Sequence, residues 1–453
     1  MEEYSSTNTS TILKKNYFTK DPVHSLEFEL SENQTINANK YSFYNVFADK
    51  RIDYASFEDR MEMLNSWIED LSYNYHNLYR RPLQTGCQPL IEVHDPADNS
   101  IRRMVNMASN DYLNLSQHPD VIEAAVRSMV DYGAGPGGAP LLSGTTNVLL
   151  QLEEKLAAMK QCEDALVFTS GYTANVGVIS TLMRSCDLVI YDMYAHASLL
   201  DGGTNTNKKF FKHNDIASLE NILVQTKDKY VNKLVVVDGV YSMDGDIAPL
   251  DKIVEIAHQY GAWVLVDEAH ATGVIGEKGG GTVEHFNLKN KVDVVTGTLS
   301  KAIGSTGGFV AGSKELINYI KYSSRPYMFS TAPFVPACAA ALKAIQIIEE
   351  DMNLRAQLWR NIRYIREELL GMGFNIGSAQ TAIFPLIIGD DYKVKQMAYL
   401  LHEEDIFVNS VPYPAVPRKI TRVRLSVTAG HTERHLCKTV DAVRKTGKQL
   451  GII

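Results

Sequence analysis

A single lysine, Lys301, lies within the stretch TGTLSKAIGSTGG, residues 296–308, which otherwise holds only small, hydroxylated and apolar residues. It is the one charged residue between Asp293 and Lys314, and it follows an apolar run that predicts a strand. Small neighbours leave a lysine room to move. Apolar surroundings also lower the pKa of its amine, so that the neutral, nucleophilic form is populated. The pattern therefore predicts a reactive lysine rather than a solvated surface charge.

Three more stretches follow predicted strands and carry polar groups that complement this lysine. Residues 170–172, SGY, open a predicted helix, whose free N–H groups suit a phosphate. Asp267 ends the run WVLVD with His270 three positions on, and Ser242 lies shortly after the run LVVVD. Ligands of open α/β sheets bind beyond the carboxyl ends of the strands. An imine-forming lysine, a carboxylate for a pyridinium nitrogen and a phosphate site are what pyridoxal 5′-phosphate requires, so we expect this cofactor.

The composition is that of an ordinary globular chain with more than one domain. The 453 residues are 45% hydrophobic and 22% charged, and the net charge of −8 argues against a nucleic-acid partner. The five cysteines are scattered without CxxC spacing, which predicts a reduced protein, and we expect no metal site. The longest apolar stretch, around residues 335–348, is too short to span a bilayer, and the start lacks a secretory signal. We therefore expect a cytoplasmic location.

Short β-branched runs alternate with helical patterns from about residue 100 onward. The runs are continuous and apolar, which is typical of a mainly parallel sheet covered by helices on both faces. The predicted strands are 165–169, 187–191, 234–238, 263–267, 292–296 and 308–311, and the predicted helices include 173–183 and 250–260. The fold class indicated is α/β.

After Pro336 the sequence pattern changes to that of long helices. A long helix with Gly371 as its C-terminal cap is followed by predicted strands near 382–388, 406–409 and 422–427. This pattern predicts a smaller α+β domain. We place the domains at 1–95, an N-terminal extension with a helical segment at 55–80, at 96–335, the large domain, and at 336–453, the small one. The polar first 45 residues are expected to lie outside any core.

Eight stretches closely resemble the α-oxoamine synthase family of pyridoxal-phosphate enzymes. They are SNDYLNL (109–115), TSGYTANVG (169–177), YAHASLLDG (194–202), DGVYSMDGDIAPL (238–250), VDEAHATGVIGEKGGG (266–281), TGTLSKAIGSTGGFVAG (296–312), MFSTAPFVPA (328–337) and VRLSVTAGHT (423–432). They follow the order and spacing of the family over roughly residues 95–450. The stretch 403–417 looks most like the serine palmitoyltransferase branch. The resemblance implies the aspartate aminotransferase-like fold, type I.

The resemblance also implies a role for each matching residue. Lys301 would hold the cofactor as a Schiff base, Asp267 would pair with the pyridinium nitrogen, and His270 would contact the phenolic oxygen. His196 would stack on the ring and help to deprotonate the substrate. The remaining expected cofactor contacts are Gly171, Tyr172, Thr298, Ser300, Ser242 and, from a second subunit, Thr331. Two residues are expected to bind the amino-acid substrate: Asn110 and Arg424.

Several of these residues also have a structural interpretation. Asp267 alone could cap a helix, and His196 could be a core histidine with satisfied hydrogen bonds. Arg424 could be a surface arginine of a strand, and Tyr172 could serve packing alone. The complete motif set favours the cofactor and substrate roles. We interpret three other histidines as structural: His213, His258 and His285.

The chain departs from the family in its glycine-rich segment. Ala139-Pro140 stands where the family has a Ser-Arg step, and Leu149 stands where it has a histidine. The lost cations favour an acyl donor held by other means, such as an acyl carrier protein that docks outside the site. We expect a homodimer with shared active sites, in which Thr331 and Asn110 complete the neighbouring site.

The expected reaction is a decarboxylative condensation of serine or cysteate with a long-chain fatty acyl thioester, carried on CoA or on acyl carrier protein. The product would be an α-amino ketone precursor of a sphingolipid or sulfonolipid. One alternative is a synthase that uses glycine or alanine, of the 8-amino-7-oxononanoate synthase or 2-amino-3-ketobutyrate CoA ligase type. An aminotransferase and a non-catalytic regulatory subunit are further alternatives.

Overall fold

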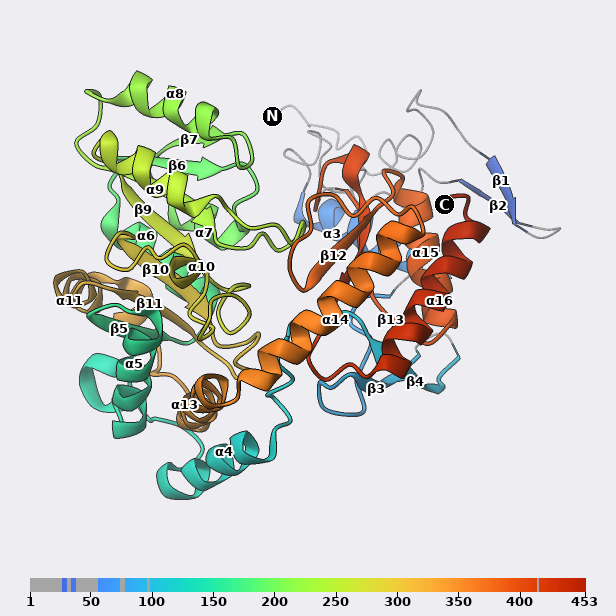
Figure 1. Cartoon of the computed structure of the whole chain (residues 1–453), viewed down its shortest axis with the longest axis horizontal. Coiled ribbons are helices and arrows are strands. Elements are labelled where there is room, and N and C mark those ends of the chain that lie inside the picture. The colour runs from blue at the N-terminus through green and yellow to red at the C-terminus, as the bar shows by residue number, and fades with distance from the viewer. Residues whose placement is uncertain (1–26, 31–33, 38–55, 74–77, 96–97, 414) are drawn as a thin grey trace, which may run out of the picture.

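The chain folds into two units, which lie side by side in Figure 1. The structure is a computed structural model that describes residues 27–30, 34–37, 56–73, 78–95, 98–413 and 415–453. Helix α14 (Met352–Gly371) runs from one unit to the other. Most of the expected N-terminal extension lies outside the described residues. Within it, β1 (Glu27–Leu30) and β2 (Gln34–Asn37) pair as an antiparallel hairpin.

The larger unit is built on a seven-stranded sheet with the order β5-β11-β10-β9-β8-β6-β7. Neighbouring strands from β10 to β7 are parallel, and β11 runs antiparallel to both of its neighbours. The strands are β5 (Asp164–Phe168), β6 (Leu188–Asp192), β7 (Asn207–Phe211), β8 (Lys233–Asp238), β9 (Trp263–Asp267), β10 (Val294–Thr298) and β11 (Gly308–Gly312). This confirms the α/β class and its mostly parallel sheet.

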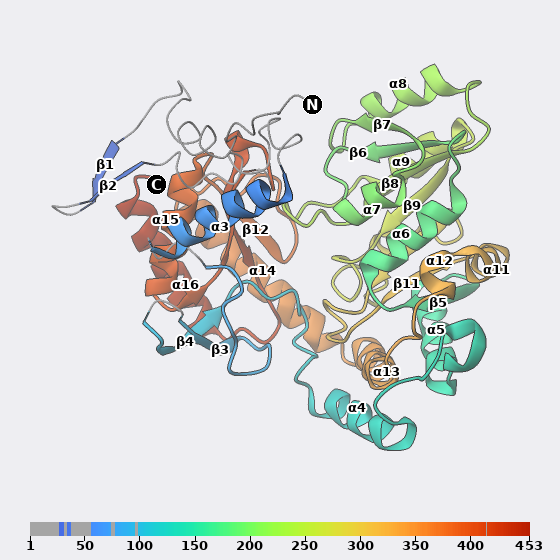
Figure 2. The same ribbon diagram turned by 180° about the vertical axis from the view of Figure 1, so that it is seen from behind.

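Helices cover both faces of this sheet because alternate strand residues are apolar on both sides (Figure 2). On β6, Val189 and Tyr191 pack with one set of helices, while Leu188 and Ile190 pack with the other. The first set is α6 (Gly171–Leu182), α7 (Ala197–Gly202) and α11 (Lys314–Ser323). The second set includes α5 (Asn147–Lys160), α8 (Ile216–Thr226) and α9 (Leu250–Gln259).

The smaller unit contains two three-stranded sheets. One has the order β12-β15-β14, formed by β12 (Ile383–Ile387), β15 (Arg422–Ser426) and β14 (Asn409–Val411). The other has the order β13-β4-β3, formed by β13 (Ile406–Phe407), β4 (Ile101–Asn106) and β3 (Leu90–His94). The helices of this unit include α14, α15 (Asp391–Glu403) and α16 (Glu433–Gln449).

The remaining helices connect the units or lie at their edges. They are α3 (Phe57–Tyr73), α4 (Pro119–Tyr132), the π-helical turn Pro140–Gly144, α10 (Thr282–His285), α12 (Arg325–Met328), α13 (Val335–Glu350) and the 3₁₀ turn Arg418–Ile420. Within the described ranges, none of the helices is both long and apolar enough to cross a bilayer.

The domain boundary expected at residue 96 falls between two strands that pair with each other. Strands β3 and β4 are antiparallel, and β4 also pairs with β13 through Val105 and Ile406. These early strands therefore lie with the C-terminal part of the chain. Conversely, α13, which follows the expected boundary at 335, packs on α4 and α5 beside the large sheet. Pairings across this many residues have no local signal.

Individual elements agree with the sequence patterns to within about two residues, with a few exceptions. Strand β10 starts at Val294 rather than Val292, because the Asp293 carboxylate accepts a hydrogen bond from the Val264 backbone. The sequence does not predict β7, because its first three residues are Asn207, Lys208 and Lys209. The run 406–409 divides into β13 and β14, which join different sheets. Helix α14 includes Gly371, and the left-handed residue is Gly373.

Gly308, at the start of β11, provides a test of how tightly the sheet packs against the turn before α6. A Cβ atom there would lie 2.3 Å from the Ser170 carbonyl oxygen and 2.4 Å from the Gly171 nitrogen. We expect Gly308→Ala to destabilise the protein by about 1–3 kcal/mol through overpacking, seen as a lower midpoint of thermal unfolding. Gly371→Ala is the control, since its Cβ meets nothing within 4 Å and alanine favours a helix. Equal midpoints for the two variants would contradict this packing.

Candidate active site

Lys301 lies in the turn after β10, at the carboxyl edge of the parallel strands. Its Nζ atom is 2.7 Å from Nε2 of His270, which follows β9. Burial lowers the pKa of the amine, Asp267 opposes this effect and the cation of Arg424 adds to it, and the resulting pKa is about 8. A substantial fraction of this amine is therefore neutral near physiological pH. These surroundings agree with the reactive lysine that the sequence pattern predicts, and its role as the nucleophile stays a prediction.

Asp267 ends β9 and is 5% exposed. Its Oδ2 atom accepts a hydrogen bond of 2.7 Å from Asn175 Nδ2, and its Oδ1 atom accepts one of 2.8 Å from the Ala269 backbone. These donors keep the carboxylate in one orientation. Asn175 lies on α6 and was not singled out from the sequence. The only signal for it was its place inside the motif TSGYTANVG.

His196 is connected to Asp267 through two intervening side chains. Asn175 Nδ2 also donates to Ser198 Oγ at 2.9 Å, and Ser198 Oγ lies 2.7 Å from His196 Nδ1. Because Ser198 Oγ accepts from Asn175, its own proton is directed to Nδ1, which leaves the imidazole proton on Nε2. Burial lowers the pKa of His196, which favours this neutral form.

Asp238 ends the neighbouring strand β8 and lies opposite Asp267 in the parallel register. Burial raises the pKa of Asp238 well above its usual value, and the charge of Asp267 raises it further. Its Oδ2 atom accepts a hydrogen bond of 3.1 Å from the His196 backbone. Protonation of Asp238 is therefore favoured.

A chain of hydrogen bonds extends from Lys301 to the small unit. The Tyr112 hydroxyl lies 2.7 Å from His270 Nδ1 and donates to Asn110 Oδ1 at 3.2 Å. Arg424 Nη2, from β15, donates to the same Asn110 oxygen at 2.9 Å. Burial lowers the pKa of His270 well below its usual value. The neutral ring then donates from Nδ1 to Tyr112 and accepts at Nε2 from Lys301.

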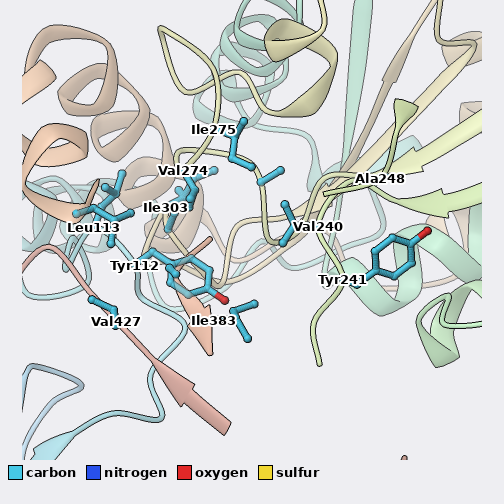
Figure 3. Close-up of a cluster of buried hydrophobic side chains, with 14 of the residues drawn as sticks. Tyr112, Leu113, Val240, Tyr241, Ala248, Val274, Ile275, Ile303, Ile383 and Val427 are labelled. Carbon is cyan, nitrogen blue, oxygen red and sulfur yellow. The ribbon is translucent and has the colours of Figure 1, made fainter. Parts of the chain in front are cut away.

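Asn110 contacts Arg424 and Tyr112 of its own chain. Its expected contribution to the site of a neighbouring subunit stays a prediction. Tyr112 was not singled out, although it lies two residues further along the same motif. Figure 3 shows Tyr112 among buried apolar side chains that include Ile383 and Val427 of the small unit. These apolar contacts exclude water from this side of the Lys301 cluster.

The N-terminus of α6 and the end of β10, which the sequence predicts to bind a phosphate, lie next to each other. Gly171 is the first residue of α6, and Ser170 caps the helix by accepting from the Thr173 backbone at 3.1 Å. The hydroxyls of Thr298 and Ser300 lie 2.8 Å apart. A Cβ atom on Gly171 would lie 3.0 Å from Thr298 Cβ, so glycine allows the helix terminus to approach the hydroxyls.

Three of the expected residues lie at the margin of this cluster. Tyr172 is 46% exposed, its hydroxyl binds Asp201, and its ring stands edge-on to His196 at 6.3 Å. Ser242 is partly buried in the loop after β8. Thr331 is exposed and, in the described part of the chain, makes no hydrogen bond with the residues around Lys301. Its expected role across a subunit boundary stays a prediction.

Two buried polar atoms of the cluster have no hydrogen-bond partner among the described residues: Asn175 Oδ1 and Arg424 Nε. Buried polar groups are normally paired, so unpaired ones at the rim of a site are suited to a ligand. Within the described residues, no group of three or more His, Cys, Asp or Glu has the arrangement of a metal site. The available groups instead fit pyridoxal phosphate: an amine, a carboxylate, a ring-stacking imidazole and a helix N-terminus with hydroxyls.

Comparison with known proteins agrees with this arrangement. The profile of the family "Aminotransferase class I and II" matches residues 102–443. The chain belongs to this family. Within it, 8-amino-7-oxononanoate synthase of Thermoanaerobacter pseudethanolicus is 43% identical over 354 residues, which are 78% of this chain and 90% of that protein. The synthase 1 of Bacillus subtilis is 42% identical over 354 residues, again 78% of this chain and 90% of that protein.

Solved structures confirm the type I fold. Serine palmitoyltransferase of S. paucimobilis with bound PLP–myriocin matches with a TM-score of 0.83 and 30% identity, over 88% of this chain and 100% of that chain. An 8-amino-7-oxononanoate synthase of Francisella tularensis matches with a TM-score of 0.66 and 26% identity, over 77% and 99%. The resemblance to the α-oxoamine synthases is confirmed, and with it a pyridoxal-phosphate-dependent acyltransferase.

Asp267 and Arg424 have opposite effects on the pKa of Lys301, so variants of the two residues should shift the pH dependence of its reaction in opposite directions. With a pKa of about 8, capture of pyridoxal phosphate by the cofactor-free protein should rise through about pH 8 and level off above it. Asp267→Asn should move the midpoint to lower pH, because that carboxylate raises the pKa of the amine. Arg424→Leu should move it to higher pH, because that cation lowers the pKa.

The rate of covalent capture can be followed by trapping the adduct with borohydride. Lys301→Ala serves as the blank and should trap none. Comparison of variants with the same cofactor cancels the cofactor's own titration. Identical midpoints in the wild type and both charge variants would show that Asp267 and Arg424 do not control the pKa of the amine. Covalent trapping of the cofactor by the Lys301→Ala variant would refute the assignment of Lys301.

Proposed function

We propose that this enzyme joins an amino acid to an acyl thioester with loss of carbon dioxide, in a reaction of the 8-amino-7-oxononanoate synthase type. The observation that carries this proposal is the 43% identity to such a synthase over 78% of this chain and 90% of the relative. Identity to the serine palmitoyltransferase structures is lower, at 30%. The comparisons therefore favour the alanine-using alternative over a sphingolipid or sulfonolipid product.

The product named by these relatives defines the two substrates. In 8-amino-7-oxononanoate the amine is on carbon 8, next to the ketone at carbon 7. Carbons 8 and 9 with the amine correspond to alanine after loss of its carboxylate. Carbons 1 to 7 correspond to a seven-carbon dicarboxylic acid activated as a monothioester. One carbon–carbon bond forms between alanine Cα and the thioester carbonyl, while the thiol and carbon dioxide leave.

Arg424 is proposed to bind the carboxylate of the amino acid. Its Nη2 atom is held by Asn110, and its Nε atom is buried and has no partner among the described residues. A guanidinium with one edge fixed and another donor free can bind a carboxylate in a defined orientation. Binding in this way would place Cα toward Lys301, since Asn110, Tyr112 and His270 link Arg424 to the Lys301 amine.

Lys301 and His196 are proposed to handle protons at Cα. The neutral amine of Lys301 can accept the Cα proton, and His270 keeps that amine oriented through the 2.7 Å contact. The hydrogen bond between Ser198 and Nδ1 fixes the orientation of the His196 ring, which presents its Nε2–H group. When bound, pyridoxal phosphate supplies the electron sink for the carbanion, and Asp267 keeps the ring nitrogen protonated. The apolar cluster around Tyr112 excludes water that would protonate the carbanion.

A second candidate is the condensation of serine or cysteate with a long-chain fatty acyl thioester. The structural match is better to serine palmitoyltransferase, with a TM-score of 0.83 against 0.66. Pro140 and Leu149 are uncharged and buried. These two positions therefore present no cation to the anionic end of a dicarboxylate. An apolar acyl chain has no need of one.

Steady-state assays of the cofactor-loaded protein distinguish the two candidates. L-Alanine, glycine, L-serine and L-cysteate are each combined with a seven-carbon dicarboxylic monothioester and with a sixteen-carbon acyl thioester. Both donors are supplied on CoA and on acyl carrier protein, which tests the expected carrier. We expect alanine with the seven-carbon donor to give the highest kcat/KM, by about tenfold or more.

The Lys301→Ala variant should be inactive with all pairs, which controls for contaminating synthases. Highest kcat/KM for serine or cysteate with the sixteen-carbon donor would replace the first proposal by the second. Formation of no ketone from any pair, with amino-group transfer instead, would refute both and indicate an aminotransferase.

We further propose that the enzyme is a homodimer formed through α4. This helix packs on α13 with one face and exposes apolar side chains on the other: Ile122, Val126, Met129 and Val130. Exposed apolar faces of this kind are typical of subunit contacts. A second copy of the chain would cover this apolar face. Thr331 is exposed and could then contact the cofactor of the partner subunit, as the expected shared site requires.

The double variant Val126→Glu/Val130→Glu should convert the dimer into a monomer, because it places charges in the apolar contact. The mass is measured by light scattering after size exclusion. Val231→Glu is the matched control, since Val231 is 90% exposed outside α4. A monomeric wild type, or a dimeric double variant, would exclude α4 as the interface.

A further inference from the structure

His213, in the turn between β7 and α8, lies between two buried carboxylates. Its Nδ1 atom is 3.0 Å from Asp192 Oδ1, and its Nε2 atom is 2.9 Å from Asp246 Oδ2. Ionised carboxylates only accept hydrogen bonds, so both ring nitrogens must donate and the ring is an imidazolium. Burial lowers the pKa of His213, but the hydrogen bonds to Asp192 and Asp246 outweigh it and raise the pKa to about 9.

The surroundings hold this ring in one orientation. The Tyr194 ring stacks on it at 4.4 Å, and the Tyr241 ring meets it edge-on at the same distance. Asn214 contacts both carboxylates: its backbone donates to Asp192 Oδ2 at 2.9 Å, and its side chain donates to Asp246 Oδ2 at 3.0 Å. A buried ion cluster of this kind holds its members in one arrangement more strictly than a surface ion pair does, because buried side chains have little freedom to repack.

One side of the cluster belongs to the segment that carries His196. Asp192 ends β6 and is fully buried, and its Oδ1 atom also accepts from the Tyr194 backbone at 2.8 Å. Two residues beyond Tyr194, the His196 backbone donates to Asp238. The position of His196 over the cofactor site is therefore tied to the same carboxylate that binds His213.

The other side belongs to the 239–248 loop, which reaches the small unit. The Gly245 carbonyl in this loop accepts hydrogen bonds from the Thr381 backbone at 3.1 Å and the Thr381 hydroxyl at 2.8 Å. The Met243 carbonyl and Asp244 Oδ1 each accept from Arg422 Nη1 at 2.8 Å. Arg422 is fully buried on β15.

Arg422 and Arg424 are two positions apart on β15, so their side chains leave the same face of the strand. A displacement of the 239–248 loop would carry Arg422 with it and shift Arg424 through the strand. Asp246 of this loop is bound by His213 and Asn214, which lie in the turn after β7 of the large sheet. The imidazolium thus joins the segment with His196 to the strand with Arg424.

We infer that His213 is a positioning residue for the amino-acid substrate: its imidazolium fixes the distance between the His196 segment of the large unit and Arg424 of the small unit. This inference rests on the proposed function, in which Arg424 binds the substrate carboxylate. It replaces the purely structural interpretation of His213.

The test uses the cofactor-loaded full-length enzyme and the change in cofactor absorbance on adding L-alanine, with L-serine as a second probe. This measures the Kd of the amino acid without turnover. His213→Gln should weaken binding about tenfold while the KM of the acyl donor stays within about twofold of wild type. His258→Gln is the matched control, because His258 pairs with Asp293 at 3.0 Å outside the site. Asp246→Asn should give the same selective loss and serves if His213→Gln folds poorly.

A double-mutant cycle separates positioning from general stability. In an Arg424→Lys background, which already lacks the oriented guanidinium, His213→Gln should change the Kd by less than about twofold. Equal losses in both backgrounds, or a lowered melting temperature with unchanged Kd, would overturn the inference and leave a structural role. A wild type that binds neither amino acid would instead count against the proposed function.

Discussion

The removal of the Lys301 amine from water is the constraint on which the arrangement of this site depends. Burial favours the neutral amine, but a neutral amine without fixed partners has no defined orientation. His270 supplies the orientation through one hydrogen bond, and it can do so because its own ring is buried and uncharged. Asp267 opposes the effect of burial and Arg424 adds to it, so the pKa of the amine settles at about 8. The reactive group is therefore balanced between two charges.

The two units of the chain contribute unequally to this balance. The large sheet supplies the lysine, the carboxylate and the helix terminus, all at the edge where parallel strands end. The small unit supplies the arginine, whose position relative to the others depends on contacts between units. Those contacts are chains of directional bonds: Arg424 to Asn110 and Tyr112 on one path, and Arg422 to the 239–248 loop and His213 on the other. Substrate recognition is thus sensitive to how the units are placed.

The sequence predicts the convergence of Lys301, Asp267, His270 and His196 because each follows a strand, and the ends of neighbouring parallel strands share an edge. It does not predict Asn175 or Tyr112, whose neutral side chains reach Asp267 and His270, which are distant in the chain. The pairing of β4 with β13 joins residues 105 and 406 and leaves no local pattern. A role of Asn110 across a subunit boundary leaves no signal in the sequence either, because the motif shows which residue is present and not which subunit it faces.

Strand β11 runs antiparallel to β10, so the chain turns back at the edge of the site instead of crossing over the sheet through a helix. Lys301 lies in this short return, which is pinned by the bond from the Leu299 nitrogen to the Gly307 carbonyl and by the bond from the Gly304 nitrogen to the lysine's own carbonyl. Gly304 has φ +71°, and a Cβ there would lie 2.4 Å from the Ser116 nitrogen. The segment has no slack to absorb an insertion or deletion. Related enzymes that differ in substrate should therefore keep the number of residues between β10 and β11 constant. Insertions and deletions should fall outside this segment.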